Sequence, residues 1–345
     1  MKDTTSNSED RCQASPKTFL SEAILLIFED EKNMKRYYTA LTIAGSDSCG
    51  GAGIQADIKT MSALGVYASS AISAITVQNT TGVFGIQKIE PEIVSGQIEA
   101  VMDDIHPQAI KIGMVNDGET IHAIAETLKK YLTAAPDKQQ TSAPTRSFQL
   151  IIDPVMVSTS GCQLMQKDAL EIFIEELLPL ASLLTPNIPE AEILAGRKIQ
   201  NVDDIRIAAS SIIQLGCNNV LIKGGHFEGT EKTDYLFEKK QHQEANKQEH
   251  AGDIRETAIY KGATINTCNT HGTGCTLSSA ITSYLARGYN MEEAISSAKA
   301  YLSDAIEAGK DVKIGEGHGP VNHFHAPQKL HIVTDESIIS DKTGK

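Results

Sequence analysis

The sequence predicts an α/β fold in which helices cover a mainly parallel central sheet. Short apolar segments rich in Ile, Leu and Val alternate with longer segments whose apolar residues recur at helical spacing. This alternation is typical of βαβ units, whose strands run parallel and whose crossover helices pack on the sheet. Glycine-rich or polar turns follow several of the apolar segments, and ligands bind at such strand ends in parallel sheets.

The first elements are predicted from residue 38 onward. Tyr38–Ala44 is an apolar strand, and Gly45–Gly53 is a glycine-rich turn. A helix follows, because apolar residues recur at helical spacing until Gly65 stops it. Ser70–Val77 is a second strand, and the weak alternation of Val83–Ile89 predicts an edge strand.

The rest of the chain continues this alternation and ends in two helices. The predicted helices are Pro91–Asp104, Asp117–Leu132, Asp168–Leu178, further turns up to Leu215, Thr276–Arg287 and Met291–Ala308. The predicted strands are Ala109–Met114, Leu150–Asp153, Ser182–Thr185 and Val220–Lys223, followed by two antiparallel strands at Tyr235–Phe237 and Thr257–Ile265.

A single domain is predicted over residues 38–330. Residues 1–37 form an N-terminal extension that we expect to be partly disordered, because its first part is polar, and residues 331–345 form a C-terminal tail. Two polar segments, 134–147 and 238–256, interrupt the alternation. Each joins elements of the same predicted sheet, so we interpret both as loop insertions rather than domain linkers.

The composition excludes several classes of protein. The chain has 345 residues, a hydrophobic fraction of 41% and a net charge of −13. This negative charge argues against a nucleic-acid or anionic-membrane partner, and no apolar run reaches the roughly 18 residues of a membrane helix. The six cysteines form no C-x-x-C pair, so neither a zinc site nor a disulfide framework is expected. A reducing cytoplasm is the predicted location.

The segment His271-Gly272-Thr273-Gly274-Cys275 is the strongest functional signal. It follows a predicted strand and opens an amphipathic helix. A glycine-rich turn at a helix N-terminus directs several backbone N–H groups at one point, which attracts anions and especially phosphate. Cys275 lies where the helix field favours a thiolate. A phosphate cradle next to a base predicts phosphoryl transfer to a small alcohol.

A second glycine cluster runs from Ala44 to Asp57 and lets backbone approach a ligand closely. Asp57 shares the apolar face of the following helix, and a buried lone carboxylate is costly unless something binds it. The alternatives are a flexible strand–helix turn and a solvated Asp57 at the edge of that face.

Two residues near strand ends suit a flat heterocyclic ligand. The side-chain amide of Gln78 both donates and accepts hydrogen bonds, so it can recognise a heterocycle edge. The thioether of Met114 can pack on the ring. The alternatives are an amide that only forms a turn and an ordinary core methionine.

Three charged residues at other strand ends suit a metal and a phosphate. Asp153 and Glu190 can hold Mg²⁺ through its waters, and Lys223 can contact a transferring phosphate. Taken singly, each has a plain alternative: a turn-forming Asp, a helix first-turn Glu and a solvated Lys. The histidines at 226, 271, 318, 323 and 325 lack a convincing ligand spacing, and we expect them at the surface or behind the site.

Eight motifs in order resemble the hydroxymethylpyrimidine/phosphomethylpyrimidine kinases of thiamine biosynthesis, in the ribokinase-like superfamily. The motifs are Ala44–Asp57 (AGSDSCGGAGIQAD), Val77–Thr80 (VQNT), Lys111–Met114 (KIGM), Asp153–Val155 (DPV), Thr185–Glu190 (TPNIPE), Lys223–His226 (KGGH), Asn269–Cys275 (NTHGTGC) and Gly319–His325 (GPVNHFH). The resemblance covers residues 38–325 and implies a ribokinase-like three-layer α/β/α sandwich. The extension and both insertions fall outside it.

The resemblance implies that MgATP phosphorylates 4-amino-5-hydroxymethyl-2-methylpyrimidine and then its monophosphate. On the acceptor side, Gln78 and Asp57 would hydrogen-bond the aminopyrimidine, and Gly45 and Met114 would line its pocket. On the phosphate side, Thr273 and Gly274 would donate N–H groups to the moving phosphoryl group, and Cys275 would be the base for the first alcohol. Asn187, Glu190 and Lys223 would help to place MgATP, together with Gly272 and Asp153. Relatives of this kind suggest a homodimer.

Other functions stay open at this point. A pyridoxal or pyridoxine kinase shares the fold and also accepts a ring with a hydroxymethyl group, but Gln78 with Met114 favours the pyrimidine. Sugar kinases of the superfamily usually carry Asp where Cys275 stands. A non-catalytic pyrimidine sensor or an interaction protein would show no ATP-dependent turnover.

Overall fold

The computed structural model describes residues 35–133, 148–156, 164–166, 168–224, 231–240 and 254–333. The expectations for residues 1–34 and for insertion 134–147 lie outside these residues, as do Gly225 and His226. Contacts divide the chain into Tyr37–His331 and a second unit of Met1–Arg36 with Ile332–Lys345. A two-stranded sheet pairs β1 (Arg36–Tyr37) with β11 (Ile332–Val333).

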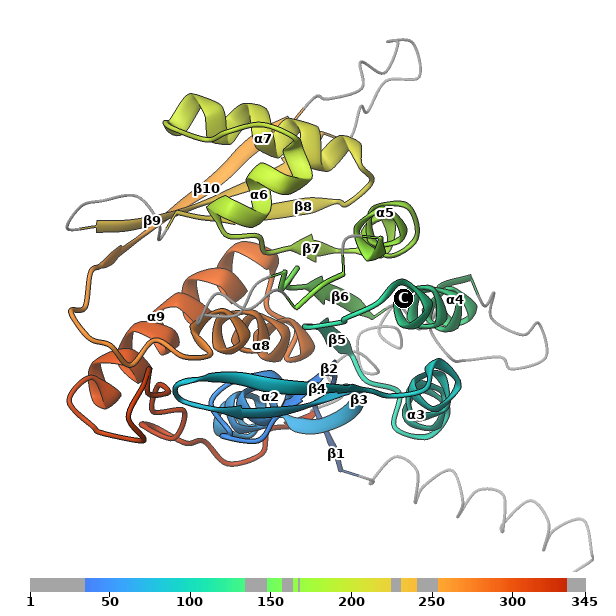
Figure 1. Ribbon diagram of the computed structural model, residues 1–345, viewed down its shortest axis with the longest axis horizontal. Coiled ribbons are helices and arrows are strands. Elements are labelled where there is room, and N and C mark those ends of the chain that lie inside the picture. The colour runs from blue at the N-terminus through green and yellow to red at the C-terminus, as the bar shows by residue number, and fades with distance from the viewer. Residues whose placement is uncertain are drawn as a thin grey trace, which may run out of the picture. The chain divides into compact units, whose positions relative to one another are not determined.

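A nine-stranded sheet forms the centre of the unit Tyr37–His331. Its strands are β2 (Thr39–Asp47), β3 (Tyr67–Asn79), β4 (Gly82–Lys88), β5 (Ala109–Ile112), β6 (Gln149–Ile152), β7 (Leu183–Leu184), β8 (Asn219–Lys223), β9 (Glu231–Lys239) and β10 (Ile254–Ala263). Their spatial order is β10-β9-β8-β7-β6-β5-β2-β3-β4 (Figure 1).

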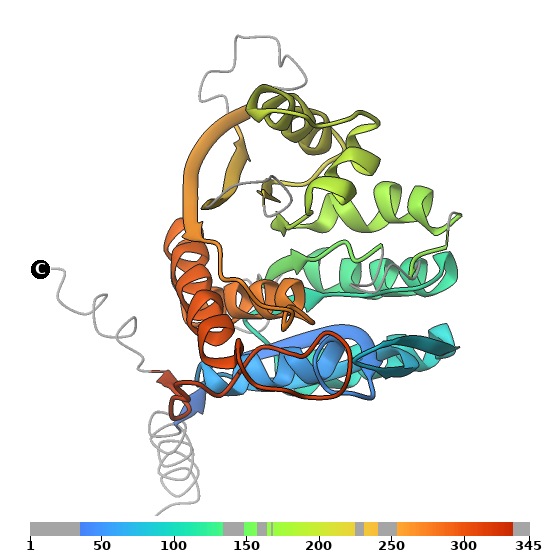
Figure 2. The same ribbon diagram turned by 60° about the vertical axis from the view of Figure 1, so that its left-hand side comes forward.

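The six strands from β8 to β3 in this order run parallel. Antiparallel strands complete both edges: β4 beside β3, and β9 and β10 beside β8. Figure 2 shows the gold and orange strands β9 and β10 at one end of the sheet, and the blue-green β4 at the other. The predicted mainly parallel sheet, the edge strand near residue 83 and the two late antiparallel strands are confirmed.

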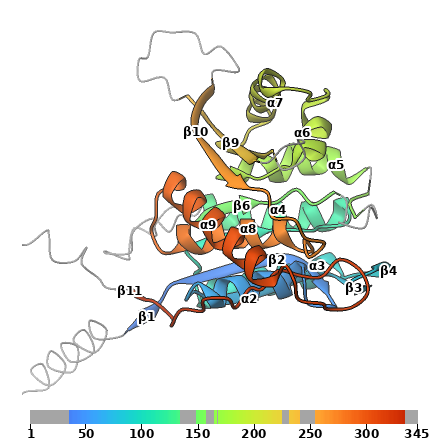
Figure 3. The same cartoon turned by 90° about the vertical axis from the view of Figure 1, so that its left-hand side faces the viewer.

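Helices cover both faces of the sheet. The helices are α2 (Gly53–Ala63), α3 (Pro91–Asp104), α4 (Gly118–Thr133), α5 (Ala169–Ile172), α6 (Ile188–Ala195), α7 (Val202–Gln214), α8 (Thr273–Ala286) and α9 (Met291–Gly309). Apolar residues of α2, α8 and α9 share one core cluster, and those of α3 to α7 share the other (Figures 1 and 3). This is the predicted α/β/α sandwich.

Alternation along the strands explains the two cores. In β5, Ile110 and Ile112 enter one cluster and Ala109 enters the other. In β8, Val220 enters the same cluster as Ile110, and Leu221 enters the same cluster as Ala109. Since successive side chains point to opposite faces, a strand covered on both sides is apolar at nearly every position; the exception in β5 is Lys111, which is buried in an ion pair with Asp57. The uninterrupted apolar runs of the sequence follow from this burial.

Two predicted segments differ from the structure. The helix expected at Asp168–Leu178 consists of α5, a π-helical turn at Phe173–Leu177 and a 3₁₀ turn at Leu178–Leu180, where Pro179 cannot donate an α-helical hydrogen bond. The insertion expected at 238–256 is narrower, because β9 continues to Lys239 and pairs there with Ile254 of β10. Polar side chains concealed these strand ends, since one face of β10 is exposed.

The parallel strands place the predicted site residues at one edge. Strand β5 ends at Ile112 and β6 at Ile152, so Met114 and Asp153 lie just past strand ends. Gln78 lies near the end of β3, and Lys223 closes β8. Among the described residues, no helix is long and apolar enough to span a membrane.

Candidate functional site

A cavity of about 780 Å³ lies at the carboxyl ends of the parallel strands, next to the N-terminus of α8. All predicted site residues except Asp57 line it: Gly45, Gln78, Met114, Asp153, Asn187, Glu190, Lys223, Gly272, Thr273, Gly274 and Cys275. The sheet therefore brings together residues that are up to 230 positions apart in sequence.

The first turn of α8 presents free backbone donors to this cavity. The first N–H groups of an α-helix have no acceptor within the helix. Thr273 donates to the Thr270 carbonyl at 3.3 Å, and Thr276 donates to the Gly272 carbonyl at 2.8 Å. Within the described part of the chain, the N–H groups of Gly274 and Cys275 have no acceptor, so they remain available for an anion.

Gly272 joins this turn to the first glycine-rich turn. Its φ of +77° is left-handed, and a Cβ at this position would lie 1.8 Å from the Gly51 carbonyl oxygen. Only glycine fits such a close backbone approach. The two glycine-rich segments of the sequence thus form one interlocked pair of loops.

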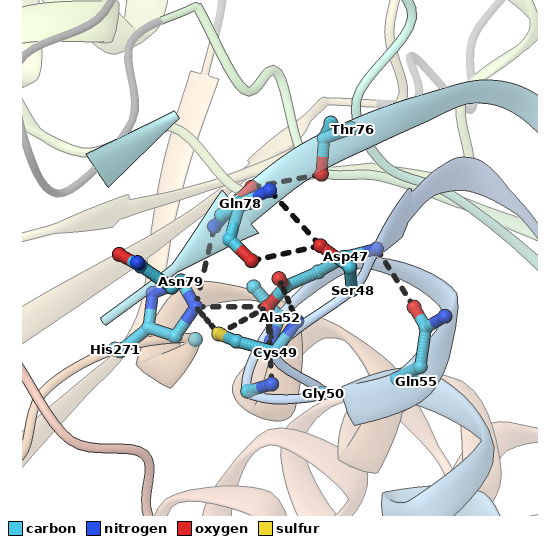
Figure 4. A network of polar contacts seen from close by, with 12 residues as sticks. Asp47, Ser48, Cys49, Gly50, Ala52, Gln55, Thr76, Gln78, Asn79 and His271 are labelled. Carbon is cyan, nitrogen blue, oxygen red and sulfur yellow. Dashed lines mark hydrogen bonds and ion pairs between the residues drawn. The ribbon is translucent and has the colours of Figure 1, made fainter. Parts of the chain in front are cut away.

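Asp47 holds the first loop in place, although the sequence did not single it out. Its carboxylate accepts the N–H groups of Cys49 at 2.9 Å, Gly51 at 3.0 Å and Ala52 at 2.8 Å, and it contacts His271 Nε2 at 2.9 Å (Figure 4). Burial raises the pKa of Asp47, but the hydrogen bonds from His271 and the backbone outweigh it and lower the pKa to about 2. An Asp followed by small residues and glycines is the local signal for this turn.

Gly45, Met114 and Gln78 form one part of the cavity lining. A Cβ on Gly45 would lie 3.1 Å from Met114 Sδ, so glycine leaves room for the thioether beside the backbone. Gln78 Oε1 accepts a hydrogen bond from Thr76 Oγ1 at 3.1 Å, and Gln78 Nε2 lies 3.4 Å from His271 Nε2 (Figure 4). These contacts orient the amide at the cavity wall.

Asp57 does not occupy the expected position in the cavity, and its predicted hydrogen bond to a ligand is not available in this structure. The side chain is fully buried, and both carboxylate oxygens contact Lys111 Nζ, at 2.8 and 2.9 Å. Thr42 and Ser279 each donate a hydroxyl hydrogen bond to it at 2.6 Å. The prediction that a buried carboxylate needs a partner was right. The partner is Lys111, which is buried on strand β5.

Cys275 lies in the first turn of α8 and lines the cavity, as predicted. The surroundings of the thiol oppose the expected thiolate. Burial raises the pKa of Cys275 to about 11; the Lys111 ammonium opposes this shift, whereas Asp57 and Asp153 add to it. A helix N-terminus lowers a thiol pKa only when burial and nearby carboxylates do not outweigh it.

The ion pair of Lys223 with Asp153 lies close to Gly274. Lys223 Nζ contacts Asp153 Oδ1 at 2.9 Å, and Thr185 also donates to this carboxylate, at 3.2 Å. Burial would raise the pKa of Asp153, but Lys223 and Lys111 hold it below its usual range. A Cβ on Gly274 would lie 3.6 Å from Lys223 Nζ, so this ammonium reaches the first turn of α8. Lys223 is therefore not the solvated lysine of the alternative interpretation.

Glu190 and Asn187 form the N-terminus of α6. Asn187 Oδ1 accepts the Glu190 N–H at 2.9 Å, and Glu190 Oε2 accepts the Asn187 N–H at 2.8 Å, which is a capping box. Burial raises the pKa of Glu190 to about 7; Lys223 opposes the shift and Asp153 adds to it. Glu190 therefore caps α6, and it also adds a second buried carboxylate to the cavity, in addition to Asp153.

Two of the histidines that we expected at the surface or behind the site are buried. His271 is 8% exposed, lines the cavity and contacts Asp47. His323 is 4% exposed, and its Nε2 lies 3.1 Å from Thr276 Oγ1 in α8. Burial lowers the pKa of His323 to about 4. The C-terminal motif therefore contacts the first turn of α8 through His323.

Comparisons with known proteins show the family of this chain. A model of the family "Phosphomethylpyrimidine kinase" matches residues 47–322. A hydroxymethylpyrimidine/phosphomethylpyrimidine kinase of Rhizobium meliloti is 48% identical over 288 residues, which cover 83% of this chain and 97% of the relative.

Solved structures show the same fold. A phosphomethylpyrimidine kinase of Clostridium difficile is 46% identical with a TM-score of 0.61, covering 78% of this chain and 99% of that chain. A pyridoxal kinase of Staphylococcus aureus, in complex with AMP-PCP and pyridoxal, is 32% identical with a TM-score of 0.65. That match covers 84% of this chain and 94% of the pyridoxal kinase.

Proposed function

This chain belongs to the phosphomethylpyrimidine kinase family, and from this premise we propose how its residues divide the reaction. The protein is a kinase of thiamine biosynthesis that uses ATP to phosphorylate hydroxymethylpyrimidine and then the monophosphate. One observation supports the proposed site most strongly: the open N–H groups of α8 and the Cys275 thiol line one cavity, between Met114 and Lys223.

The transferring phosphoryl group binds at the start of α8. The Gly274 and Cys275 N–H groups, which lack an acceptor within the described chain, donate to its oxygens. Lys223 adds a positive charge beside Gly274, and its contact with Asp153 keeps the ammonium at that position. Charge spread over the phosphoryl oxygens in the transition state is thereby stabilised by donors that are already in place.

Mg²⁺ would be held through water by Glu190 and Asp153. Both carboxylates line the cavity, and oxygen donors are the ligands that Mg²⁺ prefers. The raised pKa of Glu190 fits a cation site, since burial and the neighbouring Asp153 charge disfavour its ionised form. When bound with ATP, the ion supplies positive charge to the phosphates. Asn187 contributes indirectly, by capping α6 and thereby orienting Glu190.

The pyrimidine acceptor binds between Gln78 and Met114. Gln78 donates and accepts at the ring edge, and the Met114 thioether packs on the ring next to Gly45. Asp57 acts behind this pocket through Lys111, without touching the acceptor. The aminopyrimidine is therefore recognised by fewer side chains than the sequence alone predicted.

Cys275 removes the proton in the first phosphorylation. With a pKa of about 11, only roughly one thiol in ten thousand is ionised at pH 7, but that thiolate is a strong base for an alcohol. The rate of the first step should therefore rise about tenfold per pH unit below this pKa. The second acceptor is a phosphate monoester, already largely ionised near neutrality because its second pKa is about 6. It needs positioning rather than a base.

The test is product analysis with MgATP and three acceptors: hydroxymethylpyrimidine, its monophosphate and pyridoxal. We expect both pyrimidines to be converted to the diphosphate and pyridoxal to react far more slowly. Cys275→Ala should slow the first step by about 10²–10⁴-fold and the second much less. Cys268→Ala is the matched control, because this exposed cysteine lies outside the cavity lining. Equal losses in both single-turnover rates would reject the base role, and faster turnover of pyridoxal would reject the proposed acceptor.

A homodimer is part of the proposal. Val77 and Phe84 are 63% and 67% exposed on the neighbouring strands β3 and β4, and β4 is the edge of the sheet. An apolar edge strand is a ready surface for a second copy. Phe84→Lys should convert the dimer to a monomer in light scattering, and Ile259→Lys on β10 is the control. A wild-type mass of one chain would refute this assembly.

We propose the cytoplasm as the location. The described cysteines, among them Cys49 and Cys275, are all free, which suits a reducing compartment. Cell fractionation that recovered the protein outside the cytoplasm would contradict this.

A further inference from the structure

Three side chains of different chemistry meet beside the acceptor pocket. Asp47 Oδ2, Cys49 Sγ and His271 Nε2 all lie within 4.8 Å of one another, and they come from the two interlocked loops (Figure 4). The measured distances are 2.9 Å from Asp47 Oδ2 to His271 Nε2, 3.3 Å from Asp47 Oδ2 to Cys49 Sγ, and 3.5 Å from Cys49 Sγ to His271 Nε2. The proposed phosphoryl transfer uses neither Cys49 nor His271.

These distances are close to those of a tetrahedral zinc site. Zinc bonds of about 2.0–2.3 Å to N, O and S place ligand atoms about 3.3–3.6 Å apart. The observed triangle therefore needs to expand by about half an ångström at its shortest side and less at the others.

The surrounding contacts hold the three ligands in position. The Gly51 and Ala52 N–H groups donate to the same Asp47 oxygen, at 3.0 and 2.8 Å, and fix its direction. The backbone of His271 donates to the Gly319 carbonyl at 3.1 Å and pairs with Pro320. Hydrogen bonds of this kind orient metal ligands and strengthen binding. A mixed thiolate, imidazole and carboxylate set selects zinc over magnesium.

We propose that Asp47, Cys49 and His271 bind Zn²⁺, with the fourth coordination position open toward the cavity that Asp47 and His271 line. The ion would replace the hydrogen bonds that Cys49 and His271 now make to Asp47. Binding displaces the Cys49 thiol proton to solvent, since the thiolate is the metal ligand, and the proton that His271 Nε2 donates to Asp47 moves to Nδ1, which leaves Nε2 free to bind the ion. The sequence shows no C-x-x-C spacing at this site, because Cys49 and His271 lie 222 residues apart.

Zinc at this position inhibits the kinase. Gln78 Nε2 lies 3.4 Å from His271 Nε2, so the ion would occupy space next to the amide that binds the acceptor. This consequence rests on the proposed function, whereas metal binding itself does not. Zinc should therefore raise the KM of the acceptor alcohol more than the KM of ATP, and a chelator should restore activity.

The first experiment uses Co²⁺ as a spectroscopic probe for zinc. The full-length protein should bind one equivalent with a cobalt–thiolate charge-transfer band, and Zn²⁺ should displace it. Cys49→Ser should lose the band and at least about tenfold in affinity, a loss typical of disturbed metal sites. Serine keeps a hydroxyl donor for Asp47, and unfolding curves would verify that the loop is intact; Cys49→Ala is the second variant.

Two control variants locate the thiolate. Cys268→Ser, at an exposed cysteine, and Cys275→Ser, at the other cysteine of the site, should retain the band. A band that survives in folded Cys49→Ser, or wild-type affinity no higher than that of Cys49→Ser, would overturn the zinc site. If the site binds Co²⁺ but Zn²⁺ leaves the acceptor KM unchanged, the inhibitory role is refuted while metal binding stands. Turnover of an unexpected alcohol would refute the proposed function and leave the cobalt result untouched.

Discussion

Breaking the Asp57–Lys111 ion pair should destabilise this protein far more than breaking a surface pair. Both side chains are fully buried, and the Lys111 ammonium lies 2.8 and 2.9 Å from the two oxygens of Asp57. Burial would lower the pKa of Lys111, yet the Asp57 charge holds it above its usual range. Each charge is therefore tolerated only because the other is present.

The magnitude follows from this complete burial. Removing one partner of a buried pair costs about 3–5 kcal/mol, because the remaining charge is left in a low-dielectric interior. We expect this loss for Lys111→Met and for Asp57→Asn. In the double variant the amide oxygen of residue 57 accepts one hydroxyl hydrogen bond, its NH2 group donates to the other hydroxyl of Thr42 and Ser279, and no net charge is buried. It should lose less than either single variant.

Equilibrium unfolding in urea measures all three variants by linear extrapolation. The control is Lys130→Met, which breaks the exposed pair with Glu99 and should cost about 0–1 kcal/mol. Single variants within about 1 kcal/mol of wild type would refute the reasoning. So would a double variant whose loss equals the sum of the single losses, about 6–10 kcal/mol, because the two charges would then act independently.

The same variants test the position of Asp57. Because Asp57 does not line the cavity, Asp57→Asn should alter the KM of the pyrimidine no more than that of ATP. Lys111 lowers the pKa of Cys275, so Lys111→Met should raise that pKa and slow the first phosphorylation at fixed pH. A selective rise in pyrimidine KM for Asp57→Asn would restore the direct contact that the sequence predicted.

Three further variants test other parts of the site. Gln78→Leu should raise the pyrimidine KM more than the ATP KM in steady-state assays, and unchanged pyrimidine affinity would show that the amide does not bind the ring. Burial lowers the pKa of His323 from 6.5 to about 4. Between these pH values the unfolded chain takes up a proton at this histidine and the folded chain does not. The free energy of unfolding should therefore fall by about 3 kcal/mol from pH 6.5 to pH 4. His323→Gln should lose this pH dependence in urea unfolding, and an unaltered slope would contradict the assignment. Gly272→Ala should abolish phosphoryl transfer, because its Cβ would meet the Gly51 carbonyl; wild-type turnover would show that the two loops need not interlock.

Local patterns predicted most of the fold, for reasons visible in single elements. The helix Pro91–Asp104 was located to the residue, since a proline at its first position and an apolar stripe mark it in any context. Strand β5 was predicted from its mostly apolar sequence, which reflects the burial of both of its faces. The ends of β9 and β10 were missed, because an exposed edge strand carries polar residues that resemble a loop.

The sequence predicted those positions of the candidate site that depend on a residue's own backbone conformation or on its place at a strand end. The turn at Gly272 and the positions of Gln78 and Met114 are of this kind. The roles of Asp47 and His271 were missed, because both depend on a contact between loops 224 residues apart.

The sequence by itself determined the parallel sheet, the glycine-rich turn at the start of α8 and the family, since strand periodicity, glycine conformation and ordered motifs are local properties. Only the tertiary structure decided the electrostatics: which charge pairs with Asp57, what raises the pKa of the Cys275 thiol, and that Asp47, Cys49 and His271 meet. The physical reason is that the free energy of a charge or a ligand atom depends on its neighbours within a few ångströms, and in a parallel sheet these neighbours come from distant segments of the chain.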